Sequence, residues 1–260
     1  MREAAHVIPA RIPSALFTVV GDSTSTRFDG LMLEHPSGAV AFKARWQPVS
    51  MMRDVFHGGK LSEYLTRILM EMRYVRRTPD THWPFPRLPE RIDGGEGPAF
   101  NYEPRNAGRC VLLFSYGESD LFQLGHHYAP GFDERSAARA FQSRCEPLFE
   151  AIQMLKRIGY SNVFLHGITP PTKFEEAPWP PYAVRFKLAR IGKEVFERFA
   201  EQTGTGLITI WDDIFSDEQG RDPRYARDHL HLNQASAVLS ARQLCAQLER
   251  NGFYAPMTGA

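Results

Sequence analysis

Short apolar runs alternate with longer amphipathic stretches along this chain. The short runs, rich in valine, isoleucine, leucine and phenylalanine, predict strands over residues 16–20, 40–44, 111–116, 163–166 and 207–211. The longer stretches place apolar residues three or four positions apart, which predicts helices over residues 61–75, 136–158, 186–202 and 234–251. Strands that alternate with helices predict an α/β fold, in which helices cover a mostly parallel sheet of about five strands.

Two proline-rich segments interrupt this pattern. Residues 76–108 contain six prolines and four glycines, and residues 170–182 contain five prolines. Long irregular segments in a compact fold are often functional covers, so we expect the first to be an inserted loop that acts as a lid and the second to form the rim of a site. A chain of 260 residues is near the upper limit for one hydrophobic core, and no repeat or boundary divides it. We therefore expect residues 1–260 to form one domain.

Charge and targeting signals narrow the class of protein. The 31 lysines and arginines are interspersed with 30 acidic residues, so the sequence has no basic stripe of the kind that binds nucleic acid. Near the start of the chain the apolar runs are too short for a signal peptide or a membrane span, which predicts a cytoplasmic protein. Cys110, Cys145 and Cys245 are too scattered for a disulfide framework or a zinc site and are expected to be reduced.

A serine follows the first predicted strand. Ser23 lies just beyond residues 16–20, and Gly21 allows a tight turn that would present the hydroxyl at the sheet edge. A serine hydroxyl is a weak nucleophile unless a base lies within hydrogen-bond reach and a third group orients that base. Asp228 and His231 lie in a loop before the last predicted helix, at a spacing that lets the aspartate hold one ring nitrogen while the other faces a serine. These residues predict a Ser-His-Asp catalytic triad.

Three short motifs carry a family resemblance. They are Gly21-Asp22-Ser23, Gly117-Glu118-Ser119-Asp120, and Asp228 with His231 and Leu232. Their order, their spread over nearly the whole chain and their positions relative to the predicted strands resemble the SGNH (GDSL-type) hydrolases. The resemblance implies a flavodoxin-like three-layer α/β/α sandwich and an enzyme that cleaves acyl esters through an acyl-enzyme intermediate. It also implies a small-molecule or glycan ester as substrate and no cofactor or metal.

The resemblance further implies an oxyanion hole. Its donors would be the backbone N–H of Ser23, a glycine after the second strand, and the asparagine of a G-x-N-D motif. Gly58 and Gly59 precede a predicted helix and are equal candidates for the glycine donor. Ser119 stands where the family has asparagine, so this block is divergent and offers a hydroxyl in place of an amide. The G-E-x-D form is similar to a subgroup of G-D-S proteins associated with bacterial polysaccharide biosynthesis.

The other motif residues are expected to support the site. Asp22 is interpreted as a turn or helix-cap residue, and Gly117 and Glu118 as part of the turn that follows a strand. Asp120 is interpreted as an acceptor that holds the nucleophile loop through backbone N–H groups.

Two other classes of protein are compatible with the sequence. A metal-dependent hydrolase would take its ligands from His126, His127, Asp228, His229 and His231. The replaced asparagine and the aromatic-rich loops also fit a noncatalytic or acyl-transferring SGNH-like protein of polysaccharide metabolism. The intact order of Ser23, Asp228 and His231 favours ester hydrolysis over both.

Overall fold

A six-stranded sheet forms the centre of the computed structural model, which describes residues 15–36, 40–46, 51–57, 60–71, 75–76, 101–102, 111–157, 159–176, 178–228 and 231–253. The strand order is β10-β9-β8-β1-β3-β2. The strands are β1 (Ala15–Gly21), β2 (Met32–Leu33), β3 (Val40–Trp46), β8 (Val111–Ser115), β9 (Asn162–His166) and β10 (Gly206–Ile208). Neighbouring strands are parallel except β2 and β3, so the sheet is mostly parallel, as predicted.

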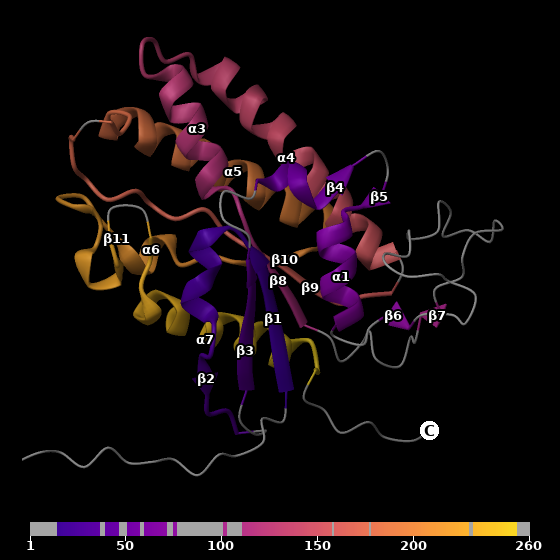
Figure 1. Cartoon of the computed structure of the whole chain (residues 1–260). Helices are drawn as coiled ribbons and strands as arrows, with labels where there is room; N and C mark the ends of the chain where they lie inside the picture. The colour runs from indigo at the N-terminus through magenta and orange to yellow at the C-terminus, as the bar shows by residue number, and fades with distance from the viewer. Residues whose placement is uncertain are drawn as a thin grey trace, which may run out of the picture.

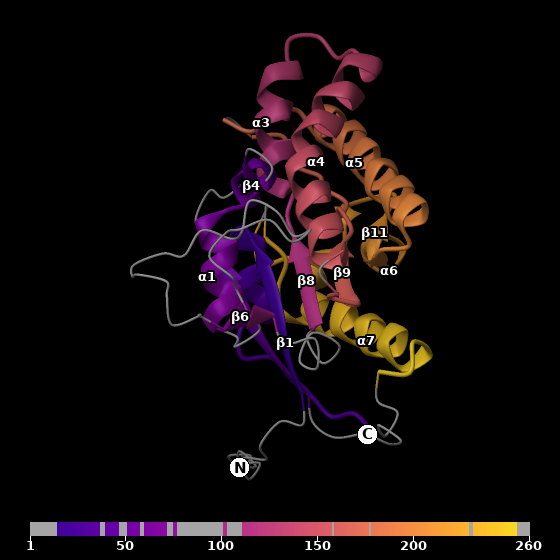
Figure 2. The same cartoon turned by 90° about the vertical axis from the view of Figure 1, so that its right-hand side faces the viewer.

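Helices cover both faces of this sheet (Figures 1 and 2). One face packs against α1 (Glu63–Glu71), α3 (Glu118–Tyr128), α4 (Glu134–Arg157) and α5 (Tyr182–Thr203), and the other against α7 (Gln234–Arg250). On β8, Leu112 and Phe114 join the first core, whereas Val111 and Leu113 join the core under α7. Successive strand side chains point to opposite faces, so this alternation builds a three-layer α/β/α sandwich.

Shorter elements decorate the sandwich. They are the 3-10 helices η1 (Ser23–Phe28), η2 (Met52–Val55) and η3 (Pro223–Tyr225), the short helix α6 (Trp211–Ile214), and three two-stranded pairs, β4 (Phe56–His57) with β5 (Lys60–Leu61), β6 (Val75–Arg76) with β7 (Asn101–Tyr102), and β11 (Phe215–Ser216) with β12 (Gly220–Arg221).

Each predicted strand and helix corresponds to an observed one, but some bounds differ, and neither β2 nor the short decorating elements were predicted. The strand predicted over 207–211 is wrong at its end, because β10 stops at Ile208 and Trp211 begins α6, whose first turn carries two acidic residues that favour a helix start. The helix predicted over 61–75 is shorter, since Leu61 belongs to β5 and Val75 to β6. Helix α3 was not predicted.

The two proline-rich segments are described to different extents. Residues 170–176 and 178–181 contain no helix or strand apart from a β-bridge between Thr172 and Gly220, as predicted for a loop, and Tyr182 begins α5. Most of 76–108 lies outside the described residues, and so does Cys110. The segment's first residue and residues 101–102 take part in the β6–β7 pair.

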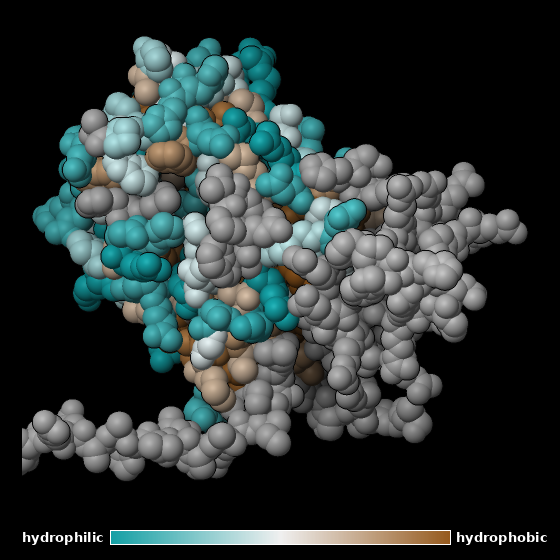
Figure 3. Space-filling view, viewed as in Figure 1, coloured by the Kyte–Doolittle hydropathy of each residue, from teal (hydrophilic) through white to brown (hydrophobic). Residues whose placement is uncertain are grey.

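The described surface is largely polar on the face shown in Figure 3. Over the part of the chain that the structure describes, no helix combines the length and the apolar run needed to cross a bilayer. Cys145 and Cys245 are buried and form no disulfide.

Candidate active site

Ser23 lies at the carboxyl edge of the sheet, on the turn that follows β1. The last residue of β1, Gly21, approaches β8 so closely that a Cβ there would overlap with the carbonyl oxygen of Ser115. A residue with a side chain cannot make this approach without displacing β8. Asp22 then caps η1, because its Oδ1 accepts a hydrogen bond from the N–H of Thr24 at 2.9 Å. The turn therefore presents Ser23 as the first residue of a capped 3-10 helix.

The three residues predicted to form the triad come together. The Ser23 hydroxyl lies 3.1 Å from His231 Nε2, although the two residues are 208 positions apart in the chain. His231 Nδ1 lies 2.9 Å from Asp228 Oδ2 and 3.0 Å from Asp228 Oδ1. A carboxylate only accepts hydrogen bonds, so Nδ1 carries the proton and Nε2 is left as the acceptor for Ser23.

The loop before α7 fixes this arrangement. Ala226 and Leu232 form a β-bridge, and the N–H of Arg227 donates to the carbonyl of His231 at 2.8 Å. The N–H of His231 donates to Asp228 Oδ1 at 2.7 Å, so backbone and ring of the histidine share one carboxylate. His229 lies between the two residues in sequence and outside the described residues. The short loop folds Asp228 back onto His231, as the spacing indicated.

Asp22 ties the nucleophile turn to α3. It is fully buried, its Oδ1 also accepts from the Thr24 hydroxyl at 2.6 Å, and its Oδ2 accepts from the Ser119 hydroxyl at 3.2 Å. Burial raises the pKa of Asp22, and the hydrogen bonds from Thr24 oppose that rise. The Ser119 hydroxyl therefore donates to Asp22 and not to a substrate oxygen in this structure. Its role as an oxyanion donor stays a prediction.

Asp120 holds a different segment from the one expected. Its Oδ2 accepts from the N–H of Met52 in η2 at 3.2 Å, so the carboxylate that holds the nucleophile turn is Asp22. Asp120 is 1% exposed, and its burial raises its pKa to about 6, against the opposing effects of the Met52 N–H and Arg144. Asp120 was expected to be a buried acceptor for backbone N–H groups of the nucleophile loop. It does accept a backbone N–H, but that N–H belongs to Met52.

Of the three glycines in the predicted site, the structure describes Gly117 but not Gly58 or Gly59. Gly58 and Gly59 lie outside the described residues, so their role as oxyanion donors stays a prediction. Gly117 is the N-cap residue of α3 and has a φ of 110°, a conformation that favours glycine, and a Cβ there would collide with Ile168. Gly117 therefore fixes where α3 begins and hence where Glu118 and Ser119 lie.

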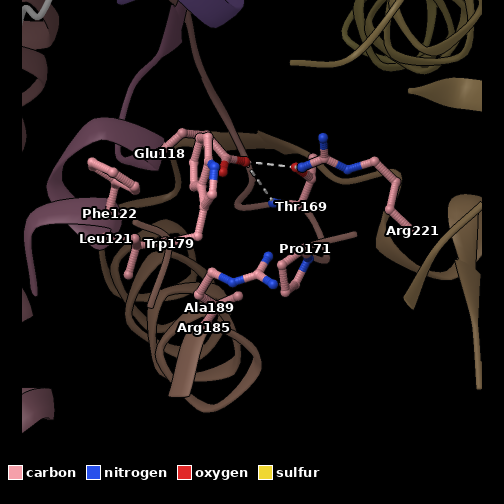
Figure 4. A pocket seen from close by; sticks show the side chains of 9 residues that line it. All are labelled: Glu118, Leu121, Phe122, Thr169, Pro171, Trp179, Arg185, Ala189 and Arg221. Atoms are coloured by element: carbon pink, nitrogen blue, oxygen red, sulfur yellow. Dashed lines mark hydrogen bonds between the residues drawn. The ribbon is translucent and has the colours of Figure 1, made fainter. Parts of the chain in front are cut away.

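A buried charged network lies next to the nucleophile turn, and sequence reasoning missed it. Glu118 Oε1 accepts from the Thr169 hydroxyl at 2.6 Å, and Arg221 Nη2 donates to the same hydroxyl oxygen at 3.2 Å (Figure 4). Arg27 is buried and donates to the Thr24 carbonyl at 2.7 Å. No local pattern marks Glu118 and Arg221, because their partners lie far along the chain: the carbonyl that accepts from Arg221 is that of Pro170, 51 positions away.

The predicted metal ligands do not form a described cluster. Within the part of the chain that the structure describes, no three His, Cys, Asp or Glu side chains are grouped to hold a metal ion. His126 packs edge-on against Phe122, with ring centroids 4.6 Å apart, and His231 is engaged by Ser23 and Asp228.

The fold and these contacts first define a class: a three-layer α/β/α protein with a serine–histidine–aspartate chain of hydrogen bonds at the carboxyl edge of its parallel sheet. No family profile matches the sequence, and no curated protein matches it. Among solved structures, the lipase Lip_vut3 from a goat rumen metagenome is similar in fold, with a TM-score of 0.51, 15% identity, and coverage of 90% of this chain and 97% of the lipase.

Two further solved structures are similar. A GDSL-like lipase from Bacteroides thetaiotaomicron has a TM-score of 0.49 and 11% identity, covering 91% of this chain and 88% of its own. An acetylxylan esterase from Geobacillus stearothermophilus has a TM-score of 0.48 and 12% identity, covering 94% and 98%. The chain thus shares the fold of the lipase Lip_vut3, and its three-layer sandwich is the fold that the motif resemblance implied.

Proposed function

We propose that this protein is a serine ester hydrolase with Ser23 as nucleophile, His231 as general base and Asp228 as the carboxylate that orients the base. The observation that carries the proposal is the continuous path from the Ser23 hydroxyl through both ring nitrogens of His231 to Asp228, with each step at 3.1 Å or less. A nucleophile, a base and an orienting group within hydrogen-bond reach are the requirements of nucleophilic acyl transfer.

The chemistry follows from the protonation states. His231 Nε2 takes the proton of Ser23 as Oγ attacks the ester carbonyl, and the imidazolium that forms is stabilised by Asp228. The same proton then passes from Nε2 to the departing alcohol, which leaves the acyl group on Ser23. Water, activated by His231, attacks this acyl-enzyme and releases the acid. No step needs a group other than the side chains and water.

The tetrahedral intermediate needs hydrogen-bond donors for its oxyanion. We assign this role to the backbone N–H of Ser23 and to Gly58 or Gly59, with Ser119 as a third donor if its hydroxyl turns from Asp22. Loss of one oxyanion donor typically lowers kcat by about a hundredfold or more. The proposed substrate is an acyl ester of a small molecule or a glycan, and the lipase-like fold supports this class.

The test is intact-mass labelling with a fluorophosphonate, which reacts only with an activated serine. We expect one adduct on the native protein and none on Ser23→Ala or His231→Ala. Ser161→Ala, which removes an exposed serine outside the site, is the matched control and should label like the native chain. Labelling that survives Ser23→Ala would reject the assignment, and an unlabelled native protein would favour a noncatalytic role.

A further inference from the structure

A pocket lies between the start of α3, the loop that follows β9, and α5 (Figure 4). Its apolar lining is formed by Leu121, Phe122, Pro171, Trp179 and Ala189. β8 and β9 end beneath it, and β8 is hydrogen-bonded to β1, whose end carries Ser23. Glu118 lines the pocket, and the next residue, Ser119, donates its hydroxyl to Asp22, the residue before Ser23, so the pocket adjoins the nucleophile turn.

We propose that this pocket receives the acyl group of the substrate and limits it to short chains, from acetyl to butanoyl. The inference rests on the proposed ester hydrolysis and adds the substrate class. It depends on three properties of the pocket: the side of Ser23 on which it lies, its size, and the rigidity of its wall.

The acyl group and the alcohol of an ester must occupy different sides of Ser23. The alcohol takes its proton from His231 Nε2 and then leaves, so it belongs on the side of the His231–Asp228 loop, where the two side chains are 27% and 45% exposed to solvent. The acyl group stays on Ser23 through both steps. A recessed apolar pocket beside the serine turn suits the part of the substrate that stays.

The pocket is small. Its volume is about 40 Å³, and one water molecule needs about 10–15 Å³ on the same measure, so about three methyl-sized groups fill it. Butanoyl has three carbons beyond its carbonyl and is the longest chain that fits. The Glu118 and Arg221 side chains in the polar wall already make hydrogen bonds within the protein, because Glu118 accepts from Thr169, and Arg221 donates to Thr169 and to the Pro170 carbonyl.

The rim of the pocket is held at a fixed distance from α5. The Arg185 guanidinium donates to three carbonyls of the β9–α5 loop, those of Thr172, Phe174 and Pro180, at 2.9, 2.5 and 2.9 Å. Trp179 packs edge-on against Phe122, with ring centroids 4.9 Å apart, and closes the pocket from the loop side. A longer chain therefore meets a wall that does not yield without breaking these contacts.

The experiment measures kcat/KM for acetyl, butanoyl, hexanoyl and octanoyl p-nitrophenyl esters. For the native protein we expect a fall of at least about tenfold from butanoyl to octanoyl, since one methylene that does not fit costs about tenfold or more. Trp179→Ala opens the wall and should raise the octanoyl-to-acetyl ratio by about tenfold. Ala189→Leu fills the pocket and should lower the butanoyl-to-acetyl ratio by a similar factor.

Phe132→Ala is the matched control, because it removes a half-buried aromatic side chain that packs near Tyr128 and Lys187 and does not line the pocket. Its chain-length profile should match the native one. A flat native profile, or variants that change all esters equally, would overturn the acyl assignment while Ser23 labelling still supported ester hydrolysis. Failure to label Ser23 together with no hydrolysis of any ester would overturn both proposals.

Discussion

Asp120 offers a test of how this fold tolerates a buried carboxylate. It is 1% exposed, and burial raises its pKa to about 6 from 3.8. A raised pKa means that the native state holds the proton more tightly than the unfolded state, so the charged form costs stability. The cost is absent below about pH 4, develops as pH rises, and is complete above about pH 6. A shift of about 2 pKa units corresponds to about 3 kcal/mol.

Asp120→Asn removes the charge and keeps an oxygen that can accept from the N–H of Met52. The stability of the variant relative to the native protein should therefore rise by about 3 kcal/mol between pH 4 and pH 7. The assay is urea unfolding followed by tryptophan fluorescence at each pH unit from 4 to 8, with the free energy of unfolding compared at each pH.

Asp212→Asn, at an exposed position in α6, is the matched control and should give a curve parallel to the native one. The reasoning depends on the slope and not on any constant offset. The attraction of Arg144 for the charged carboxylate is already contained in the pKa of Asp120 and so in the expected slope. A difference between Asp120→Asn and the native protein that stays constant with pH, or that shrinks as pH rises, would refute it.

Three further changes test the site and its supports. Gly21→Ala forces a Cβ against the Ser115 carbonyl and should destabilise the fold by about 1–3 kcal/mol or more, seen as a lower midpoint of thermal unfolding; an unchanged midpoint would contradict the close approach. Asp228→Asn should lower kcat on the acetyl ester by about 10⁴-fold, because His231 then loses its orienting acceptor; a loss of less than tenfold would count against the triad. Arg185→Met frees three carbonyls of the β9–α5 loop and should make that loop the first site of limited proteolysis; native-like resistance would show that the arginine does not hold it.

The three residues of the proposed triad could be predicted from the sequence because each lies in a recognisable local pattern. A serine after a buried strand and an aspartate–histidine pair before a helix are local patterns, and each is legible within about ten residues. What brings Ser23 and His231 to 3.1 Å is the stacking of α7 on the face of β1 that carries Phe17 and Val19, which no local period encodes. In the sequence, only the order of the motifs along the chain indicated that Ser23 and His231 belong to the same site.

The features that sequence reasoning missed are tertiary ones. Helix α3 begins soon after β8 ends, at Glu118, where no helix was predicted, although Leu121, Leu124 and Tyr128 have the spacing of a buried helix face. Trp211 ends an apolar run but begins a helix. Arg221 carries no local signature, because its acceptors are the Pro170 carbonyl and the Thr169 hydroxyl of the loop after β9.

The separation of Ser23 from His231 also governs when the site can come into existence. Asp228 and His231 are synthesised more than two hundred residues after the serine turn, and α7 must dock on the sheet to bring them to the serine. A nascent chain or a proteolytic fragment that ends before Asp228 carries the serine without its base. If His231 is the base, such an incomplete product would not react with a fluorophosphonate, and the serine would become reactive only after His231 has been synthesised and α7 has docked.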